Sequence, residues 1–557
     1  MIRLAFAVLP NDNRVRFTSA AFTANFREKE EKPMSTQNHQ CLCCPECSES
    51  AYSGDQWEIT RRRFAAAGGL LMSALTLKGL QSALYADETE TPLLMPKPRT
   101  PLIVKPILCH DVSQRREAAS WRRWGDIQSV EAANEEIARI KTELDGVKQR
   151  ADYPIDVLDI SRCTDAKQMT GHPDVEKCDV VLFYGAGDGI YGVEKYGKDV
   201  IVFQRWNSGP VYRHIITVSA RFLRQHTDEQ MLPGIRNSDV VVDDPEELDW
   251  RFRALCGLKN TVGSKIITIG GAGAWSQPAG VVPELAKKFW KFEYHDVDYT
   301  ELKKLIEEAK NDEKVMARAK KRADAYLKIP GTTLETEMDF FVHGFVLDEV
   351  FRLLMKKVDT NLITVNSCMG TIMPTSKTTA CMTLTTLNDD GYLAFCESDF
   401  VVIPSGVLLG NICGKPVFLG NPGFPFKKTS TICHCTAPRK MDGKNYDPVR
   451  IVTHYESDYG AAPWVKVPLG TVTTHIAPSF KSDRWVGLKG TIVDVPFKPS
   501  ACRTQITVRR ECSDELLADN LVGFHWMTCF GDYRKEIGYA LRRIGIPWHN
   551  LDEAAAK

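Results

Sequence analysis

The chain has 557 residues, more than one hydrophobic core usually supports, so about three or four domains are expected. Its 43% hydrophobic and 25% charged residues are typical of a soluble globular protein. The 71 Lys and Arg residues balance the 71 Asp and Glu residues, which argues against a nucleic-acid partner, and no stretch has the ~18 uninterrupted apolar residues that cross a bilayer.

An export signal is predicted within an N-terminal leader at residues 1–86. The arginines at 61–63 lie between Thr60 and Phe64 and precede a run rich in Ala, Gly and Leu. This order resembles the twin-arginine class of signals, with cleavage after Ala86, export to the periplasm and no membrane attachment afterwards. The alternative is an amphipathic helix of the mature fold that begins at these arginines, which would leave the protein in the cytoplasm.

Two further features of the leader concern its start and its cysteines. Met34, which is followed by polar residues, is a more natural start than Met1. Four cysteines precede the arginines: Cys41, Cys43, Cys44 and Cys47. They resemble half of a zinc knuckle, but no second Cys or His pair lies nearby. Thirteen later cysteines, an odd number scattered through apolar stretches, are typical of free buried thiols, as in a protein that folds before export.

A linker and a first α/β domain follow the leader. Residues 87–101 are rich in Pro and charge, which favours an extended chain, and the domain is predicted over 102–258. Apolar strands are expected at 102–109, 153–161, 178–187 and 199–205, and an amphipathic helix at 130–151. Strands that alternate with helices imply a parallel sheet.

A second α/β domain is predicted over 259–424. A strand at 264–269 runs into Gly270, Gly271 and Gly273. Because these glycines lack the spacing G-x-G-x-x-G, we interpret them as a tight turn that lines a cleft and not as a phosphate-binding loop. Helices are expected next at 299–328 and 338–358, and then a strand at 361–367.

The last part of the chain, residues 425–557, changes character. Its short β-rich segments with frequent Gly and Pro predict an antiparallel barrel or sandwich, and a helix is expected at 532–546. The predicted fold class is therefore α/β, with two doubly wound α/β domains followed by a β-rich, barrel-like C-terminal domain.

Side chains that suit metal binding or acid and base chemistry concentrate in the last third of the chain. Glu397 and Asp399 end an apolar strand, where open α/β sheets bind ligands, and strand alternation predicts that both lie on one face. The others are Asn421, His434, His454, Glu456, Asp458, His475, His525, Asp532 and Glu536. A single histidine in such a set is more often a core or surface residue than a ligand.

The segment FCESDFVVIPSGVLLGNICGKPVFLGN, residues 395–421, resembles the L-fucose isomerase family. In that family a strand ends in Glu-x-Asp, a helix follows, and a second strand ends in an acid; the Glu and this last acid bind a divalent metal and form the catalytic pair. Glu397 and Asn421 stand at these two positions. The segment FHWMTCFGDYRKEIGYALRRIGIP, residues 524–547, aligns without a gap with the family's final segment and places His525 at its histidine ligand.

The resemblance covers roughly residues 100–557 and implies a function. It implies interconversion of an aldose and a ketose through an enediol, with Glu397 as base and metal ligand and His525 as a neutral imidazole ligand. The implied metal is Mn²⁺, with Mg²⁺ or Zn²⁺ as alternatives. The implied partners are a sugar or sugar derivative and further copies of the chain, since relatives are ring-like oligomers.

Asn421 departs from the family, because an amide cannot act as a general acid or base near neutral pH. Three alternatives stay open. His434 replaces the missing ligand and completes a two-His-one-carboxylate site; or a metal binds and the reaction is an epimerisation or elimination on a sugar acid; or the site binds carbohydrate without turnover. If Glu397 and Asp399 merely cap the following helix, the register of His525 is unexplained.

Two residues near these ligands are candidates for substrate contact. Asp399 either contacts the substrate or supports the site from outside it. Trp526 either offers an apolar face to sugar C–H groups or packs in the core. The identity of the sugar depends on the shape of the cleft, which the sequence does not define.

Overall fold

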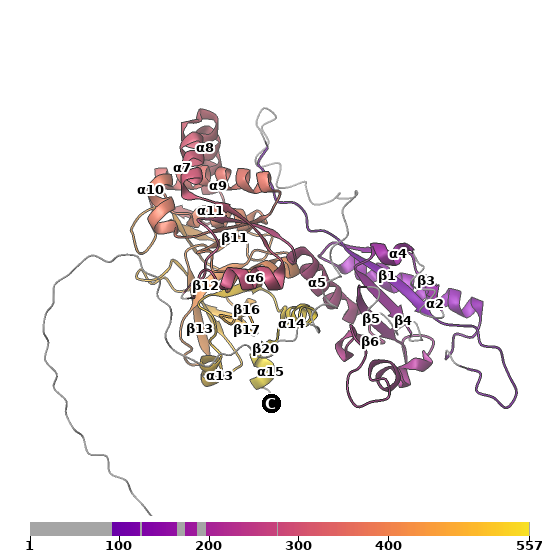
Figure 1. The fold of residues 1–557 in the computed structure, drawn as a ribbon. Helices are drawn as coiled ribbons and strands as arrows, with labels where there is room; N and C mark the ends of the chain where they lie inside the picture. Colours follow the sequence, from indigo (N-terminus) through magenta and orange to yellow (C-terminus); the bar gives the residue numbers. More distant parts are fainter. Residues whose placement is uncertain (1–91, 123–124, 164–172, 186–196, 276, 556–557) are drawn as a thin grey trace, which may run out of the picture. The chain divides into compact units, whose positions relative to one another are not determined.

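The computed structural model describes residues 92–122, 125–163, 173–185, 197–275 and 277–555. The predicted leader, with its arginines and cysteine cluster, and the first residues of the predicted linker lie outside the described residues. Among the described helices, none combines the length and the apolar character that crossing a membrane requires. These described residues form a mixed α/β fold, with two parallel sheets, one small mixed sheet and an antiparallel barrel (Figure 1).

The first sheet has six parallel strands in the order β2-β1-β4-β5-β6, with β3 also paired to β1. The strands are β1 (Leu102–Cys109), β2 (Ile155–Val157), β3 (Ser161–Cys163), β4 (Val180–Tyr184), β5 (Asp199–Gln204) and β6 (Val240–Val242). The helical segments are α2 (Val130–Arg150), α4 (Pro173–Lys177), η5 (Arg213–Ile216), η6 (Val218–Leu223), η7 (Asn237–Asp239) and α5 (Glu246–Thr261). The single strand expected at 153–161 is wrong, because β2 and β3 pair separately with the two halves of β1.

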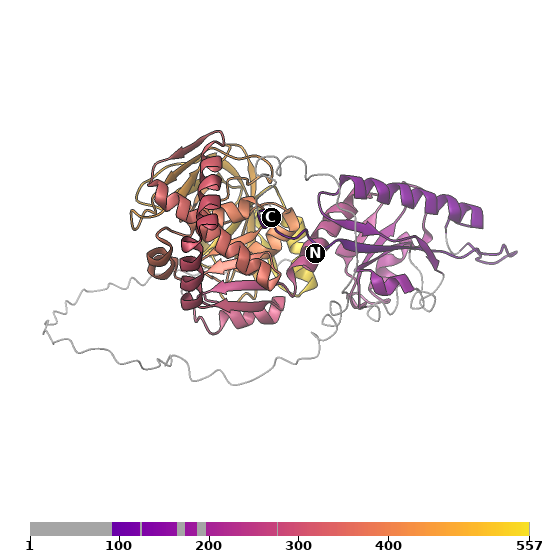
Figure 2. The ribbon, with the colours of Figure 1, turned by 90° about the horizontal axis from the view of Figure 1, so that it is seen from above.

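Apolar side chains cover both faces of this sheet. On one face Leu182 belongs to the same buried cluster as Leu144 of α2, the long helix that runs beside the sheet in Figure 2. On the other face Phe183 belongs to a second cluster with Phe222 of η6. Because neighbouring residues of a strand point to opposite faces, β4 needs apolar residues throughout.

The second sheet has four parallel strands in the order β11-β10-β7-β8. The strands are β7 (Lys265–Ile269), β8 (Glu293–Val297), β10 (Leu362–Val365) and β11 (Leu393–Cys396). The helical segments are α6 (Val282–Trp290), α7 (Tyr299–Asn311), α8 (Glu313–Leu327), α9 (Met338–Val358), η8 (Cys368–Ile372), α10 (Met373–Ser376), α11 (Cys381–Asp389) and α12 (Ile403–Cys413). The carboxyl ends of β7, β10 and β11 therefore meet along one edge.

The expected helix at 299–328 is in fact two helices. The chain leaves helical geometry at Asp312, whose side chain accepts hydrogen bonds from the backbone N–H groups of Lys314 and Val315. An aspartate in this role caps the start of a new helix. Because the spacing of apolar residues stays helical through both α7 and α8, the sequence pattern predicted a single helix at 299–328.

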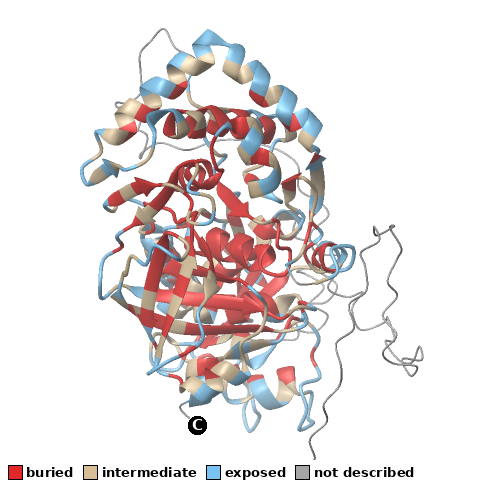
Figure 3. Ribbon diagram, turned by 90° about the vertical axis from the view of Figure 1, so that its left-hand side faces the viewer, coloured by how far each residue is buried: buried red, intermediate tan, exposed pale blue. Residues whose placement is uncertain are grey.

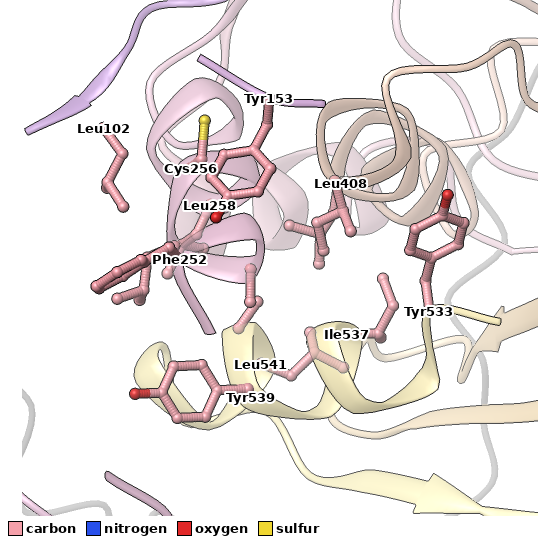
Figure 4. Close-up of a cluster of buried hydrophobic side chains, with 14 of the residues drawn as sticks. Leu102, Tyr153, Phe252, Cys256, Leu258, Leu408, Tyr533, Ile537, Tyr539 and Leu541 are labelled. Carbon is pink, nitrogen blue, oxygen red and sulfur yellow. The ribbon is translucent and has the colours of Figure 1, made fainter. Parts of the chain in front are cut away.

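Helix α12 is buried along its whole length and joins several elements. Leu408 of α12 lies in one apolar cluster with Phe252 of α5 and with Ile537 and Leu541 of the C-terminal helix α14 (Arg534–Arg543) (Figure 4). A helix that is apolar all round is typical of such a buried position. Figure 3 shows buried residues gathered in the interior and exposed residues on the outer side of the helices at the top of the view.

The C-terminal region forms a closed antiparallel barrel of six strands, in the order β16-β19-β12-β13-β18-β17 and back to β16. The strands are β12 (Phe418–Pro422), β13 (Thr429–His434), β16 (Val472–Pro478), β17 (Trp485–Asp494), β18 (Thr504–Arg509) and β19 (Trp526–Phe530). Closure settles the choice between barrel and sandwich, because each strand has a partner on both sides.

Other elements complete this region. The small sheet has the order β15-β14-β9, and β20 adds to β17 in parallel. The bounds are β9 (Thr332–Leu334), β14 (Val449–Val452), β15 (Ala462–Val465), β20 (Trp548–Asn550), α13 (Asp514–Asp519), α14 (Arg534–Arg543) and α15 (Leu551–Ala555). Strand β12 precedes residue 425, where the β-rich domain was expected to begin. The barrel thus takes one strand from the segment assigned to the second α/β domain.

Candidate metal centre

The strand that precedes Glu397 ends earlier than expected. β11 stops at Cys396, and both Glu397 and Ser398 have left-handed backbone conformations, with φ of 68° and 44°. Strand alternation therefore does not orient Glu397 and Asp399, and that part of the prediction is wrong. A hydrogen bond from the backbone N–H of Gly273 to the carbonyl of Ser398, at 3.1 Å, holds the turn against the loop after β7.

The two acids meet at one histidine. His525 lies immediately before β19, and its imidazole is fully buried. Its Nδ1 is hydrogen-bonded to Oδ2 of Asp399 at 2.7 Å, and its Nε2 lies 2.9 Å from Oε2 of Glu397. Asp399, itself fully buried, thereby fixes the orientation of the ring so that Nε2 faces Glu397.

A second histidine approaches Glu397 from the barrel. His434 is the last residue of β13, on the buried face that it shares with Ser430 and Ile432. Its Nδ1 is hydrogen-bonded to the hydroxyl of Thr436 at 3.0 Å, and its Nε2 lies 3.5 Å from Oε1 of Glu397. As in His525, one ring nitrogen is held by the protein while the other faces the carboxylate.

Glu397, His434 and His525 can hold one metal ion. Each offers one ligand atom, and these atoms lie within 4.8 Å of one another. Oε2 of Glu397 and Nε2 of His525 are buried 2.9 Å apart and have no hydrogen-bond partner elsewhere, so both atoms are available to one bound cation. Two carboxylates, those of Glu397 and Asp399, also give the site the formal negative charge that a divalent cation balances. These residues fit a bound cation.

The site is strongly polarised without a cation. Burial alone raises the pKa of Glu397, but His434 and His525 outweigh it and hold that pKa well below its usual value. Burial lowers the pKa of His525, but Asp399 and Glu397 outweigh it and raise the pKa to about 9. A cation would take the place of a proton between these groups, since imidazole ligates a metal only when neutral at the ligating nitrogen.

The donor set indicates the kind of metal. Two imidazole nitrogens and one carboxylate oxygen suit first-row transition metals such as Zn²⁺, Fe²⁺ or Mn²⁺. Mg²⁺ prefers a shell of oxygen atoms, so it fits these residues less well.

Asn421 occupies β12 beside these ligands. Its backbone pairs with Cys433, the residue before His434, and Gly420 pairs with Trp526, the residue after His525. Because paired residues of antiparallel strands share a face, the Asn421 side chain is on the face of β13 opposite to His434. The structure thus brings together Glu397 and the two histidines, and it places Asn421 on the adjacent strand.

Trp526 packs in the core and does not face the site. It is 3% exposed and lies in the barrel core, which is the second of the two alternatives given for it. Trp275 and Phe524 are instead 43% and 39% exposed, and their rings stack at 5.1 Å. Trp275 donates its backbone N–H to Asp399 at 3.3 Å, and Phe524 lies edge-on to His525 at 4.8 Å. Sequence reasoning missed this pair, because the two residues lie in different domains of the predicted division.

Other candidate residues have structural partners. His475 is buried in the barrel between the hydroxyls of Thr473 and Thr528, and burial lowers its pKa to about 3. Asp532 is paired with Arg534 at 2.7 Å. Glu456 accepts a hydrogen bond from Tyr455 at 2.9 Å. Sequence reasoning also assigned no role to three thiols beside His434, those of Cys381, Cys435 and Cys502. The order Cys-His-Cys at 433–435 is the sequence signal that could have indicated one of them.

A scan against protein-family models and a search of curated proteins found no match for this chain.

Proposed function

We propose that this protein is a metal-dependent sugar isomerase of the L-fucose isomerase-like kind, which interconverts an aldose and a ketose. The observation that carries the proposal is the convergence of Glu397, His434 and His525 on one space, with Asp399 holding His525. Glu397 and His525 are the residues that the resemblance assigns to metal binding. His434 supplies the third ligand that Asn421 does not.

The topology of the sheets supports the proposal. We propose that both parallel sheets are doubly wound: in chain order, the first five-strand path is 2-1-3-4-5 and the second sheet is 2-1-3-4. Doubly wound sheets bind ligands beyond the carboxyl ends of their strands. Glu397 follows the carboxyl end of β11, and Trp275 follows that of β7, so the candidate site has this location.

The residues would divide the chemistry as follows. A divalent cation, for which we propose Mn²⁺, would polarise the carbonyl and hydroxyl oxygens of the sugar. Glu397 is 28% exposed, while His434 and His525 are 4% and 0% exposed, so Glu397 is the ligand that a substrate reaches. Its carboxylate is ionised at neutral pH, which is the form that accepts a proton from a sugar carbon.

A second proton-transfer group is needed because Asn421 cannot serve. We assign this role to His454, which is 7% exposed and lies in the electrostatic field of His434 and Glu397. Burial lowers its pKa, so the imidazole is neutral at pH 7 and can both accept and donate a proton. The exposed rings of Trp275 and Phe524 would pack against the C–H face of the sugar.

Metal content and turnover test the proposal. We expect purified protein to bind one equivalent of Mn²⁺ and to isomerise at least one member of a panel of aldoses, and we expect Glu397→Ala to lose both properties. Glu511→Ala, which removes an exposed acid of the C-terminal region, is the matched control and should retain both. Absence of stoichiometric metal in the wild type, together with no effect of Glu397→Ala, contradicts the proposal.

A noncatalytic carbohydrate-binding protein is the second candidate. The amide at Asn421 and the exposed Trp275–Phe524 pair favour it, because stacking rings bind sugars without any proton transfer. This candidate is supported if calorimetry shows that the protein binds a sugar and if the protein does not convert that sugar with any added metal. An epimerase or lyase acting on a sugar acid would instead consume that sugar acid in the presence of Mn²⁺.

We also propose export and self-assembly. The predicted twin-arginine signal supports a periplasmic location. Twelve cysteines of the described residues are free thiols, such as Cys109, Cys178 and Cys256, which fits folding in a reducing compartment before export. A homo-oligomer is proposed from the resemblance to ring-forming relatives. Fractionation of cells and light scattering of the purified protein would test these two proposals.

A further inference from the structure

Three thiols form a cluster beside the candidate metal centre. Cys381 and Cys435 are buried together with Ala462, and Cys502 packs against them. Cys435 is the central residue, because its thiol interacts with the thiols of both Cys381 and Cys502 within this cluster. All three are free thiols. Cys435 therefore has two neighbours with which it could form a disulfide.

The three thiols differ in their access to solvent. Cys435 and Cys381 are 2% and 5% exposed, whereas Cys502 is half-buried. A dissolved oxidant reaches the more exposed sulfur first. Cys502 is thus the residue that would react with the oxidant, and Cys435 is the neighbour that would complete the bond.

The cluster is connected to a metal ligand through the backbone. Cys435 directly follows His434, and Cys502 lies two residues before Thr504, whose backbone pairs with His434 across β13 and β18. Any movement that draws Cys435 toward Cys502 must therefore pull on the residue that holds the His434 imidazole.

We propose that Cys435 and Cys502 form a reversible disulfide that weakens the metal site. In the first step, the Cys502 thiolate attacks one sulfur of a low-molecular-weight disulfide such as oxidised glutathione, and one glutathione thiolate leaves. In the second step, the Cys435 thiolate attacks the Cys502 sulfur of the mixed disulfide, and the second glutathione leaves. Together the two cysteines lose two electrons and two protons. The glutathione disulfide takes up these electrons and protons and becomes two molecules of reduced glutathione.

The effect on the metal follows from the length of the new bond, and this part rests on the proposed function. A disulfide brings two sulfur atoms to about 2 Å, much closer than two thiols that only pack against each other. Ligand distances in a metal site tolerate changes of only about 0.2 Å. Oxidation therefore displaces His434 from its place opposite Glu397, and a loss of metal affinity of about tenfold or more is expected.

The test treats metal-loaded full-length protein with oxidised glutathione. Mass spectrometry of unreduced peptides locates the bond, and titration with Mn²⁺ measures the affinity. Wild type should acquire a Cys435–Cys502 disulfide, lose affinity by about tenfold, and recover after reduction with dithiothreitol. Cys435→Ser should keep a stable glutathione adduct on Cys502, and Cys502→Ser should acquire neither the adduct nor the bond.

Cys433→Ser is the matched control, since Cys433 is half-buried and lies on the other side of His434 in the sequence. It should oxidise and lose affinity as the wild type does. A Cys433–Cys502 bond, loss of affinity in oxidised Cys435→Ser, or an oxidised wild type with unchanged affinity would overturn the inference. A mapped Cys435–Cys502 bond in a protein that binds no metal when reduced contradicts the proposed function and supports the thiol chemistry. Metal binding by a protein that forms no Cys435–Cys502 disulfide supports the proposed function and contradicts the thiol chemistry.

Discussion

Glu397 and Ser398 show how strongly single residues are constrained at this site. Both adopt left-handed backbone conformations, which cost roughly 1–2 kcal/mol each for residues with a side chain. Backbone hydrogen bonds on either side offset this strain, one from Gly273 to Ser398 at 3.1 Å and one from Phe400 to Gly273 at 3.0 Å. The turn directs Glu397 toward both histidines, so the strain is part of how the site is formed.

At the same scale, Asp389 is a buried acid outside the site. Its Oδ1 accepts backbone hydrogen bonds from Arg439 and Lys440, both at 2.7 Å, but Oδ2 has no partner. Burial raises the pKa of Asp389 to about 7, in spite of these two hydrogen bonds. Ionisation of Asp389 therefore opposes folding.

The pH dependence of stability tests this assignment. Because the folded pKa is above the unfolded value of about 3.9, the stabilising effect of the neutral acid is fully present below about pH 4 and is lost as the pH rises through 7. Asp389→Asn cannot ionise, so we expect its unfolding free energy to exceed that of the wild type by about 1–3 kcal/mol at pH 8 and to approach it near pH 4. Urea unfolding across this range measures the difference, and parallel profiles for the two proteins would contradict the assignment.

At the scale of elements, the contact between α5 and α12 depends on a glycine. A Cβ added to Gly257 of α5 would lie 2.3 Å from Cγ1 and 3.0 Å from Cα of Ile412. The backbones of the two buried helices are therefore too close for any side chain at this position. Gly146 of α2 is also in a helix interior, but a Cβ there would meet only the end of the Arg150 side chain at 3.3 Å.

Two alanine substitutions should act in opposite directions. Gly257→Ala should lower the unfolding free energy by about 1–3 kcal/mol, because the buried helices must separate to admit the methyl group. Gly146→Ala should raise it by about 0.5–1 kcal/mol, because alanine favours the helix and the flexible Arg150 can move away. Chemical denaturation of both variants measures the pair of effects. Equal effects of the two substitutions would show that the helix contact is not close-packed.

The elements also show what the sequence could predict. Apolar periodicity identified most of the parallel strands and helices, because burial on both faces leaves a continuous apolar strand. It could not locate the break at Asp312, since the cap depends on one side chain and leaves the apolar pattern intact. Residue type and family-like spacing indicated Glu397, His434 and His525. The pairing of Trp275 with Phe524 could not be predicted, since it depends on long-range packing.

At the scale of the molecule, the candidate metal centre connects two structural layers. Glu397 follows a strand of the second parallel sheet, whereas His434 and His525 belong to the barrel. Asp399 and His525, which form its shortest contact, are 126 positions apart in the sequence. A cation bound to all three ligands therefore ties the sheet to the barrel.

Metal removal should consequently destabilise the whole molecule. A ligand that binds only the folded state stabilises it by about 2.7 kcal/mol at one hundred times its dissociation constant. We expect Mn²⁺ to raise the temperature of unfolding of the wild type and a chelator to lower it, with neither effect in Glu397→Ala. Differential scanning calorimetry measures these shifts. If the wild type unfolds at the same temperature with and without chelator, the prediction that a bound cation stabilises the folded protein is wrong.

Strand β12 has an evolutionary consequence. It lies before the expected domain boundary at residue 425, yet it fills the place between β13 and β19 in the barrel. Residues 425–557 transferred alone to an unrelated protein would lack β12 and form a barrel with a gap and two unpaired strand edges, which are prone to aggregation. A recombination that separates β12 from the rest of the barrel is therefore expected to destabilise it, because the second sheet and the barrel share this part of the chain.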